Sequence, residues 1–268
     1  MKKSLFFIFT ICSFVVAKSQ TADSVINRFI EANGGKERLN SINTLQLQSV
    51  LNMEQMGMSI NITSVKQKNK LFRIQSSNPM ASEDSYTCIT DTAGYSYTPA
   101  INSPMGSIDA ALTKFTAEEL AEQQYQTDCS GFFAQLVDYA EKGCTATFTG
   151  TEKVADIVCD KVKLKTKFGQ EMVYFISQLN GQVRRVQVSA PVAMEMMGLS
   201  SMMKAFGGGG AGRMGDRKLD IDYEKYKLFD GFPFPTRQSI SLGPMQVVIE
   251  NSGFQVNQTI DPKWYKVK

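Results

Sequence analysis

The chain has 268 residues, of which 43% are hydrophobic, 10% aromatic and 21% charged. This composition is typical of a folded globular protein and excludes the disordered, collagen-like and coiled-coil classes. The sequence contains no histidine. That absence excludes Ser-His-Asp and Cys-His catalysis, histidine proton relays and zinc sites built on imidazole.

Residues 1–19 have the pattern of a secretory signal peptide. Two lysines precede an apolar run over residues 5–17, and a small residue lies on each side of Lys18, directly before Gln20. The run is too short to cross the roughly 30 Å core of a bilayer. We therefore expect an exported protein, located in the periplasm, with no stable membrane span and a mature chain that starts near Gln20.

The charge of the chain depends on this segment. The whole sequence has 29 Lys and Arg against 26 Asp and Glu, a net charge of +3. Removal of the first 19 residues takes away three lysines and no acid, which leaves a neutral mature chain with 26 of each. No Lys and Arg cluster of the kind that binds nucleic acid remains, so we expect no nucleic-acid partner.

Four cysteines follow the predicted signal peptide: Cys88, Cys129, Cys144 and Cys159. In an oxidising compartment an even number permits two disulfides, with three possible pairings, and buried free thiols are the alternative. A helix predicted between Cys129 and Cys144 would hold these two more than about 7 Å apart, which disfavours that bridge. No C-x-x-C motif occurs, so nothing supports redox catalysis.

The first part of the chain changes from helical to strand periodicity. Residues 22–33 predict a helix, because apolar residues recur at helical spacing before a Gly-Gly pair, and a short helical turn is expected at residues 36–40. The apolar period then becomes two, which predicts an antiparallel meander. Its strands are expected at residues 44–53, 58–65, 71–77, 86–90 and 95–98.

Two helices are predicted in the middle of the chain. Thr116 and Glu119 have the spacing of a capping box that begins the first helix, which extends to about Gln126. The second is expected at residues 131–141, which are rich in aromatic and aliphatic side chains. Strands then return at residues 145–153, 158–167, 171–177, 182–189, 218–228, 235–242 and 245–251, and a short segment around Trp264 follows.

These elements predict one mainly β domain over residues 20–268. Its expected form is a curved antiparallel sheet, or incomplete β-barrel, with helices covering the concave face. Asn180-Gly181 is a strong signal for a hairpin turn, and residues 230–235 (DGFPFP) predict a structural turn with aromatic side chains. A Met- and Gly-rich loop is expected at residues 191–217.

Two motifs could bind ligands but have simpler explanations. Residues 207–212 contain G-x-G-x-x-G without a strand before and a helix after, so a flexible loop is favoured over a nucleotide site. Asp220, Asp222 and Glu224 share one face of a strand, where they could gather Ca²⁺ or form a solvated outer face opposite a Lys-bearing strand. We therefore predict no metal site, no cofactor and no catalytic residue.

The 14 methionines are the unusual feature of the sequence. Unbranched, polarisable side chains suit an adaptable apolar surface that lines a cavity or a lid. Thioethers also bind Cu(I), and plain core packing is a third possibility. The candidate ligand-binding residues are Met53, Met56, Met58, Met194, Met196, Met197, Leu199, Met202, Met203 and Phe206.

Several segments together resemble a known family. A helix that ends within residues 31–39 (EANGGKERL) precedes a long strand, DYEKY follows at residues 222–226 and DGFPFP at residues 230–235, and Trp264 lies near the last residue. Over most of residues 22–268 the sequence resembles the outer-membrane lipoprotein-sorting proteins of the Bacteroidetes type, relatives of the LolA and LolB carriers. The resemblance implies a half-closed antiparallel barrel with helices in its mouth and an apolar cavity for acyl chains.

On this basis we expect a non-enzymatic exported carrier that binds lipid or lipoprotein acyl chains in an apolar cavity. Two alternatives stay open: an envelope assembly protein that presents the methionine-rich loop to a partner protein, and a Met-rich Cu(I)-binding protein. An enzyme is the least expected, because the sequence shows no nucleophile–base pair.

Overall fold

The computed structural model describes residues 20–77, 81–103, 106–199, 217–243 and 245–268. Its strands are β1 (Thr44–Met53), β2 (Met58–Gln67), β3 (Leu71–Ser76), β4 (Ser85–Thr90), β5 (Gly94–Thr98), β6 (Ile101–Ser103), β7 (Gly106–Ile108), β8 (Ala111–Lys114), β9 (Thr145–Val154), β10 (Ile157–Lys165), β11 (Glu171–Ser177), β12 (Val183–Ser189), β13 (Lys218–Phe229), β14 (Phe232–Leu242) and β15 (Met245–Val256). The α-helices are α1 (Ala22–Ala32), α2 (Lys36–Asn40), α3 (Ala117–Gln123) and α4 (Ala190–Met196), and the 3₁₀ helices are η1 (Glu54–Met56), η2 (Gln124–Thr127), η3 (Ala134–Leu136) and η4 (Pro262–Tyr265).

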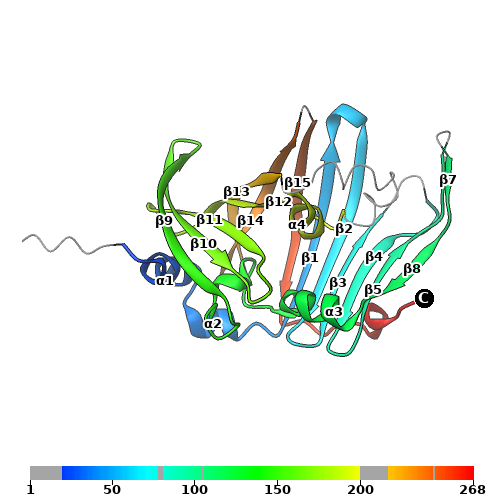
Figure 1. The fold of residues 1–268 in the computed structure, drawn as a ribbon, viewed down its shortest axis with the longest axis horizontal. Coiled ribbons are helices and arrows are strands. Elements are labelled where there is room, and N and C mark those ends of the chain that lie inside the picture. The colour runs from blue at the N-terminus through cyan, green and yellow to red at the C-terminus, as the bar shows by residue number, and fades with distance from the viewer. Residues whose placement is uncertain (1–19, 78–80, 104–105, 200–216, 244) are drawn as a thin grey trace, which may run out of the picture.

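Two successive meanders build one 13-stranded antiparallel sheet, in the order β8-β5-β4-β3-β2-β1-β15-β14-β13-β12-β11-β10-β9. From β1 the chain winds outward to β8 at one edge, and from β9 at the other edge it winds back to β15, which pairs with β1. No ladder joins β8 to β9 in the described ranges, so the sheet is open. Figure 1 shows these edges at opposite ends of a curved sheet, which confirms the predicted incomplete barrel.

Residues 115–144 connect the two edges of the sheet, and we call them the crossing segment. Since β8 and β9 lie at opposite ends, this segment passes across the sheet, with α3, η2 and η3 along it (Figure 1). Its Phe133, Leu136 and Val137 are buried in the main core, together with residues of the central strands and of α1. The core therefore lies on the same side of the sheet as the crossing segment.

Local signals in the sequence account for several boundaries. Thr21 caps α1, and Thr116 and Glu119 form the predicted capping box at the start of α3. The turn between β13 and β14 has Asp230 at φ 49° and Gly231 at φ 78°, the left-handed conformation that two-residue hairpin turns require. The predicted capping box at Thr116 and the predicted turn at residues 230–235 are confirmed.

The predicted helix at residues 131–141 is wrong. Only the short 3₁₀ turn η3 forms there, and Asp138 adopts φ 52°, a left-handed conformation that ends helical geometry. The amine of Lys142 donates hydrogen bonds to the carbonyl oxygens of Ala134 and Val137. A side chain thus satisfies carbonyl groups that helical amides would otherwise satisfy, and the irregular chain still buries its apolar residues.

The four cysteines are free thiols, so of the two alternatives the structure has thiols rather than disulfides. Cys88 lies in a small cluster that includes Trp264, Cys159 lies in another with Phe175, and Cys129 lies in the main core. Burial raises the pKa of Cys129 to about 11 and also raises that of Cys88. These thiols are therefore protonated and unreactive at neutral pH.

The predicted signal peptide lies outside the described residues. So do residues 200–216 of the predicted loop, which include the glycine motif at 207–212. The beginning of that loop is helical instead, because Ala190–Met196 forms α4, with Pro191 in its first turn. Among the described residues, no helix has both the length and the apolar character needed to cross a membrane.

Candidate ligand cavity

A cavity of about 160 Å³ lies between the central strands and the crossing segment. Strands β1, β2 and β3 contribute apolar side chains to one wall: Leu45, Leu47, Ile62, Phe72 and Ile74. The opposite wall includes Phe132 and Phe133 of the crossing segment, and Met196 and Met197 at the end of α4. The lining is therefore mainly apolar.

Residue size on the strands keeps this space open. Leu47 pairs across β1 and β2 with Ser64, and Ser49 pairs with Ile62, so a large side chain faces a small one in each pair. The Ser49 hydroxyl donates to Oδ1 of Asn251, at 2.7 Å, and is satisfied within the sheet. Larger side chains at the two serines would fill the cavity.

Aromatic contacts fix the crossing segment above the strands. The rings of Phe132 and Phe133 lie 5.0 Å apart in an edge-to-face arrangement, and Phe133 makes a similar contact with Tyr223 at 4.9 Å. Phe132 also approaches Phe254, at 6.2 Å. Edge-to-face pairs of this kind stabilise a contact beyond the burial of their area. The segment thus forms a fixed wall of the cavity.

Lys66 on β2 brings a positive charge to this apolar surface. Its Nζ donates a hydrogen bond to the carbonyl oxygen of Asp128, at 3.2 Å, and lies 5.5 Å from the ring centre of Phe72. Burial lowers the pKa of Lys66, and the nearby charge of Lys142 acts in the same direction, while Cys129 and Asp128 oppose the change. The residue is half-buried because part of its side chain faces the cavity while protein surrounds the rest.

Glu195 on α4 brings a carboxylate to a different part of the cavity wall. It accepts a hydrogen bond from the side-chain amide of Gln126 in η2. Burial raises the pKa of Glu195, hydrogen bonds from Gln123 and Gln126 oppose the rise, and the charge of Glu122 adds to it. The charged groups that act on Glu195 therefore differ from those that act on Lys66.

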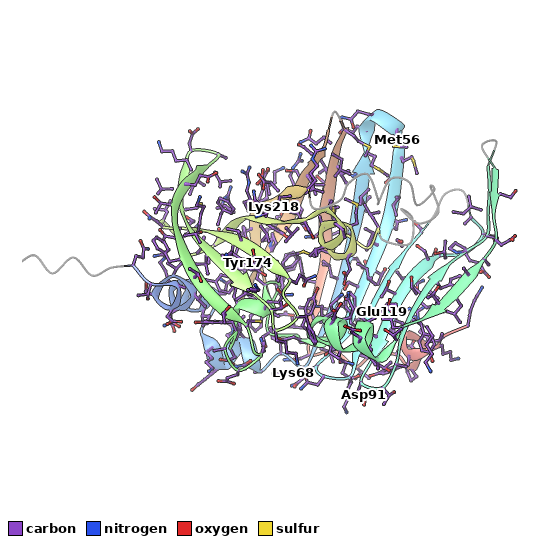
Figure 2. The ribbon with its side chains drawn as sticks, viewed as in Figure 1. Met56, Lys68, Asp91, Glu119, Tyr174 and Lys218 are labelled. Carbon is purple, nitrogen blue, oxygen red and sulfur yellow. The ribbon has the colours of Figure 1, made fainter. Side chains whose placement is uncertain are left out.

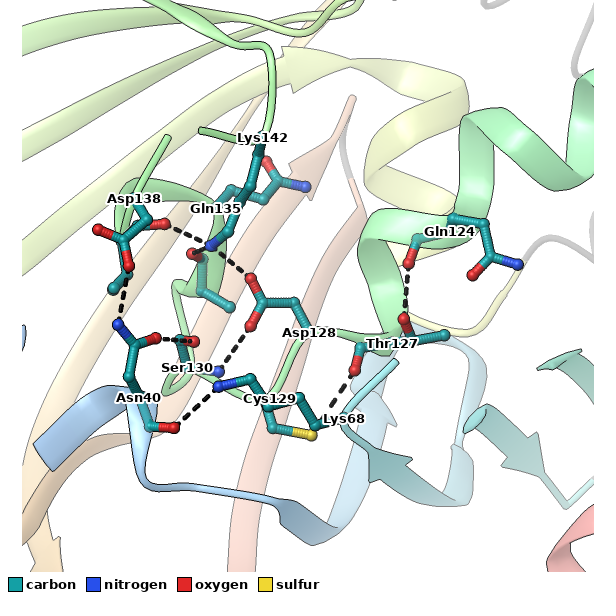
Figure 3. A network of polar contacts seen from close by, with 12 residues as sticks. Asn40, Lys68, Gln124, Thr127, Asp128, Cys129, Ser130, Gln135, Asp138 and Lys142 are labelled. Carbon is teal, nitrogen blue, oxygen red and sulfur yellow. Dashed lines mark hydrogen bonds and ion pairs between the residues drawn. The ribbon is translucent and has the colours of Figure 1, made fainter. Parts of the chain in front are cut away.

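A second, polar hollow of about 450 Å³ adjoins the cavity, and we call it the vestibule. Tyr125 and Gln135 line both spaces and form the boundary between them. Figure 3 shows the network on the vestibule wall, where Asp128 pairs with Lys142 and accepts a hydrogen bond from the backbone amide of Ser130, at 2.9 Å. Together the two spaces offer an apolar part and a polar part to one ligand.

The predicted ligand residues near α4 divide between the cavity and the core. Met196 and Met197 line the cavity, and Met196 keeps 40% of its surface exposed, so the cavity wall reaches solvent there. Met194 and Leu199 are buried in the main core. Three further predicted residues lie outside the described parts of the chain: Met202, Met203 and Phe206.

The predicted residues around the first hairpin lie outside the cavity lining. Met53 is buried in the main core, and Met58 packs against that core. Met56 is 54% exposed at the tip of the β1–β2 hairpin, at the far end of the strands from Lys68 (Figure 2). The structure thus does not bring this group together with Met196 and Met197 in one described space.

The acidic residues of β13 form ion pairs with arginines. Arg185 on β12 lies 3.0 Å from Asp220 and 2.6 Å from Asp222, and Arg237 on β14 lies 3.6 Å from Glu224. Of the two explanations considered for these carboxylates, the arrangement corresponds to a polar outer face, but the basic residues opposite it are arginines and not the predicted lysines.

The sequence analysis did not predict Lys66 as a cavity residue. Strand periodicity places residue 66 on the same face as Ile62 and Ser64. Val65, on the other face, is also fully buried, in the cluster that includes Trp264. Because both faces of β2 are covered here, periodicity alone does not tell which face carries the cavity. Glu195 had no comparable signal, since its helix was not predicted.

No protein-family model matches the sequence, and no curated protein sequence matches it either. Among solved structures, a LolA superfamily protein from Nitrosomonas europaea matches 93% of this chain and 99% of its own, with a TM-score of 0.53 and 10% sequence identity. The chain has a LolA-like fold. A DUF1329 family protein from Desulfovibrio piger matches 92% of this chain and 98% of its own, with a TM-score of 0.49 and 7% identity. The LolA-like resemblance predicted from the sequence is confirmed for the fold.

Proposed function

We propose that the protein is a non-enzymatic carrier that binds the acyl chains of lipids or lipoproteins in the apolar cavity. The observation that carries this proposal is the apolar cavity between the open sheet and the crossing segment. The LolA-like fold supports it. The signal-peptide pattern supports export to the periplasm, where such a carrier would meet envelope lipids.

Burial of methylene groups supplies the binding free energy. Each methylene moved from water into an apolar space contributes about 0.8 kcal/mol, so ten contribute about 8 kcal/mol before the cost of association. The cavity of about 160 Å³ is smaller than the roughly 300–1,000 Å³ of common ligand pockets. A long chain therefore requires Met196 and Met197 to move aside, which their unbranched side chains allow.

A variant that fills the cavity tests this proposal. Leu47→Trp places an indole in the apolar wall, and delipidated protein of this variant should bind a fluorescent fatty acid at least about tenfold more weakly than the wild type. Gln46→Trp is the matched control, because Gln46 lies next to Leu47 on the opposite face of β1. It should bind the probe as the wild type does.

Two outcomes would contradict the proposal. Wild-type protein that binds no fatty acid and yields no lipid by native mass spectrometry is not an acyl carrier. Equal binding by wild type and Leu47→Trp, with both proteins folded by circular dichroism, would place the binding site outside this cavity.

A further inference from the structure

Lys66 is unusual because its charge lies in the apolar wall without an acidic partner. Its amine has a carbonyl oxygen as hydrogen-bond acceptor and an aromatic ring nearby. Within the described ranges, no carboxylate lies within the 4.0 Å of an ion pair with Lys66. Lys142, in contrast, pairs directly with the carboxylate of Asp128.

An ammonium group that is partly withdrawn from water and has no ion-pair partner is costly to a folded protein. Methionine or leucine at this position would pack against Leu45 and Phe72, which flank Lys66 on the neighbouring strands, without that cost. The lysine therefore weakens the empty protein, and a negatively charged group in the cavity would offset the penalty.

The position of Lys66 places such a group at one end of the apolar space. Lys66 lies close to Asp128, Cys129 and Lys142, and two of these, Asp128 and Lys142, line the vestibule. The amine is thus near the boundary between the apolar cavity and the polar vestibule. A ligand with its chain among Leu47, Ile62 and Ile74 would have its head at Lys66.

We infer that the ligand is a single-chain amphiphile with a compact anionic head, and that Lys66 binds this head. The inference rests on the proposed carrier function and names its ligand class. The cavity volume favours one chain, because about 160 Å³ must already widen to hold a single long chain and would have to widen much further for the several chains of a fully acylated lipoprotein. The compact ammonium suits carboxylate and phosphate alike, so the head-group source is decided by experiment.

The test compares charged and neutral ligands with the same tail. Laurate, dodecyl phosphate and methyl laurate are titrated into delipidated wild type, Lys66→Met, Lys66→Arg and Lys163→Met. Wild type should bind laurate or dodecyl phosphate at least about tenfold more tightly than methyl laurate, since a charge-assisted hydrogen bond is present only with the anions. Lys66→Met should lose this preference and bind methyl laurate no more weakly than the wild type does.

The other two variants test whether the preference for an anion depends on a positive charge at residue 66 or on the net charge of the protein. Lys66→Arg keeps the cation and should keep the preference for an anion. Lys163 lies on the face of β10 opposite to Val162 and Leu164, which face the core. Lys163→Met therefore removes a lysine outside the cavity and should bind the ligands as the wild type does. A preference for laurate identifies a carboxylate ligand, and a preference for dodecyl phosphate identifies a phosphate monoester; either result supports the inference.

Failure of the inference differs from failure of the carrier function. If wild type and Lys66→Met bind all three ligands equally, the inference is overturned and the carrier function stands. If wild type binds none of them, the carrier function fails. The thermal unfolding midpoint of Lys66→Met should be no lower than that of the wild type, which rules out misfolding as the cause of weaker anion binding.

Discussion

Gln126 donates its side-chain amide to the carboxylate of Glu195, and this contact joins η2 of the crossing segment to α4 at the cavity wall. The two residues come from segments about 70 positions apart in the chain. Exposed Met196 follows Glu195 directly, so the contact lies beside the part of the wall that reaches solvent. A polar contact thus holds the methionine-bearing helix against the rest of the cavity.

Replacement of Glu195 by glutamine should stabilise the protein at neutral pH. Burial raises the pKa of Glu195 above its usual value of 4.5, so the folded state holds this proton more tightly than the unfolded state. The carboxyl group therefore favours folding at acidic pH, and its contribution is lost as the pH rises through the raised pKa. Glu195→Gln should therefore be more stable than the wild type at pH 7.

The measurement is the free energy of unfolding in urea, for both proteins, from pH 4 to pH 8. The stability advantage of Glu195→Gln should grow as the pH rises above the usual pKa of 4.5 and should level off above the raised pKa. A variant whose stability falls further below that of the wild type as the pH rises would mean that the hydrogen bond from Gln126 to the carboxylate outweighs the burial penalty.

The pKa of Lys66 shifts in the opposite direction to that of Glu195. Burial lowers its pKa below the usual value of 10.5, so the folded state binds this proton less tightly than the unfolded state. The resulting destabilisation is present at pH values below the lowered pKa and disappears as the pH rises towards 10.5. Asp128, Cys129, Lys142 and the ring of Phe72 are the groups that face the amine.

Lys66→Met should therefore unfold with a greater free energy than the wild type at pH 7, measured without ligand. The difference between the two unfolding free energies should narrow as the pH rises through the lowered pKa towards 10.5. An unfolding free energy below that of the wild type at pH 7 would show that the hydrogen bond to Asp128 and the contact with Phe72 outweigh the burial penalty.

Loss of the Asp160 carboxylate should strongly destabilise the fold. This fully buried group pairs with Arg28 of α1 and accepts a hydrogen bond from Gln178, at 2.6 Å. Asp160→Ala would leave the guanidinium of Arg28 without its partner, at an expected cost of about 3–5 kcal/mol in urea unfolding. Glu152→Ala, which removes an exposed partner of Lys161 on the adjacent strand, should cost less than about 1 kcal/mol. Similar losses in the two variants would contradict a role for Asp160 in holding α1.

Substitutions at two glycines measure the cost of backbone strain with and without a steric clash. Gly169 and Gly181 both have positive φ, 88° and 68°, but only Gly181 lies against another element. A Cβ atom there would come 2.7 Å from the Cβ of Ala32 and 2.8 Å from the carbonyl oxygen of Arg28, whereas nothing lies within 4 Å at Gly169.

Gly169→Ala should cost about 1–2 kcal/mol in thermal or urea unfolding, from strain alone. Gly181→Ala should cost about 1–3 kcal/mol more, because α1 has to move away from the β11–β12 turn. Equal costs would mean that α1 shifts freely and is not fixed against this turn.

The sheet could be predicted from the sequence because its signals are local. Period-two alternation and turn residues such as Asn180 and Gly181 identify strands one at a time, and antiparallel meanders connect neighbouring strands in order. The interruption of the predicted helix at Asp138 could not be predicted, since it depends on the amine of Lys142 reaching the carbonyl oxygens of the turn.

The cavity could be predicted only in part. The methionines at 196 and 197 were proposed as ligand residues and do line it, but Lys66 gave no clear signal because Val65 and Lys66 both occupy covered faces of β2. A second layer on the outer face, formed by Ile260, Trp264 and Val267, covers Val65. Contacts between residues so far apart in the sequence cannot be derived from the local pattern of one strand.

The order of the strands divides the sheet into two halves that are joined by one hydrogen-bonded ladder. Each meander is continuous in sequence, and the two halves meet in the sheet at the β1–β15 ladder, where a bulge lies between Gln48 and Ser49. The chain itself passes from one half to the other through the crossing segment, residues 115–144, which runs from β8 at one edge of the sheet to β9 at the other edge. Any widening of the cavity by bending at the β1–β15 ladder must therefore pull on the crossing segment. The distance between the two edges of the sheet is thus coupled to the position of Phe132 and Phe133.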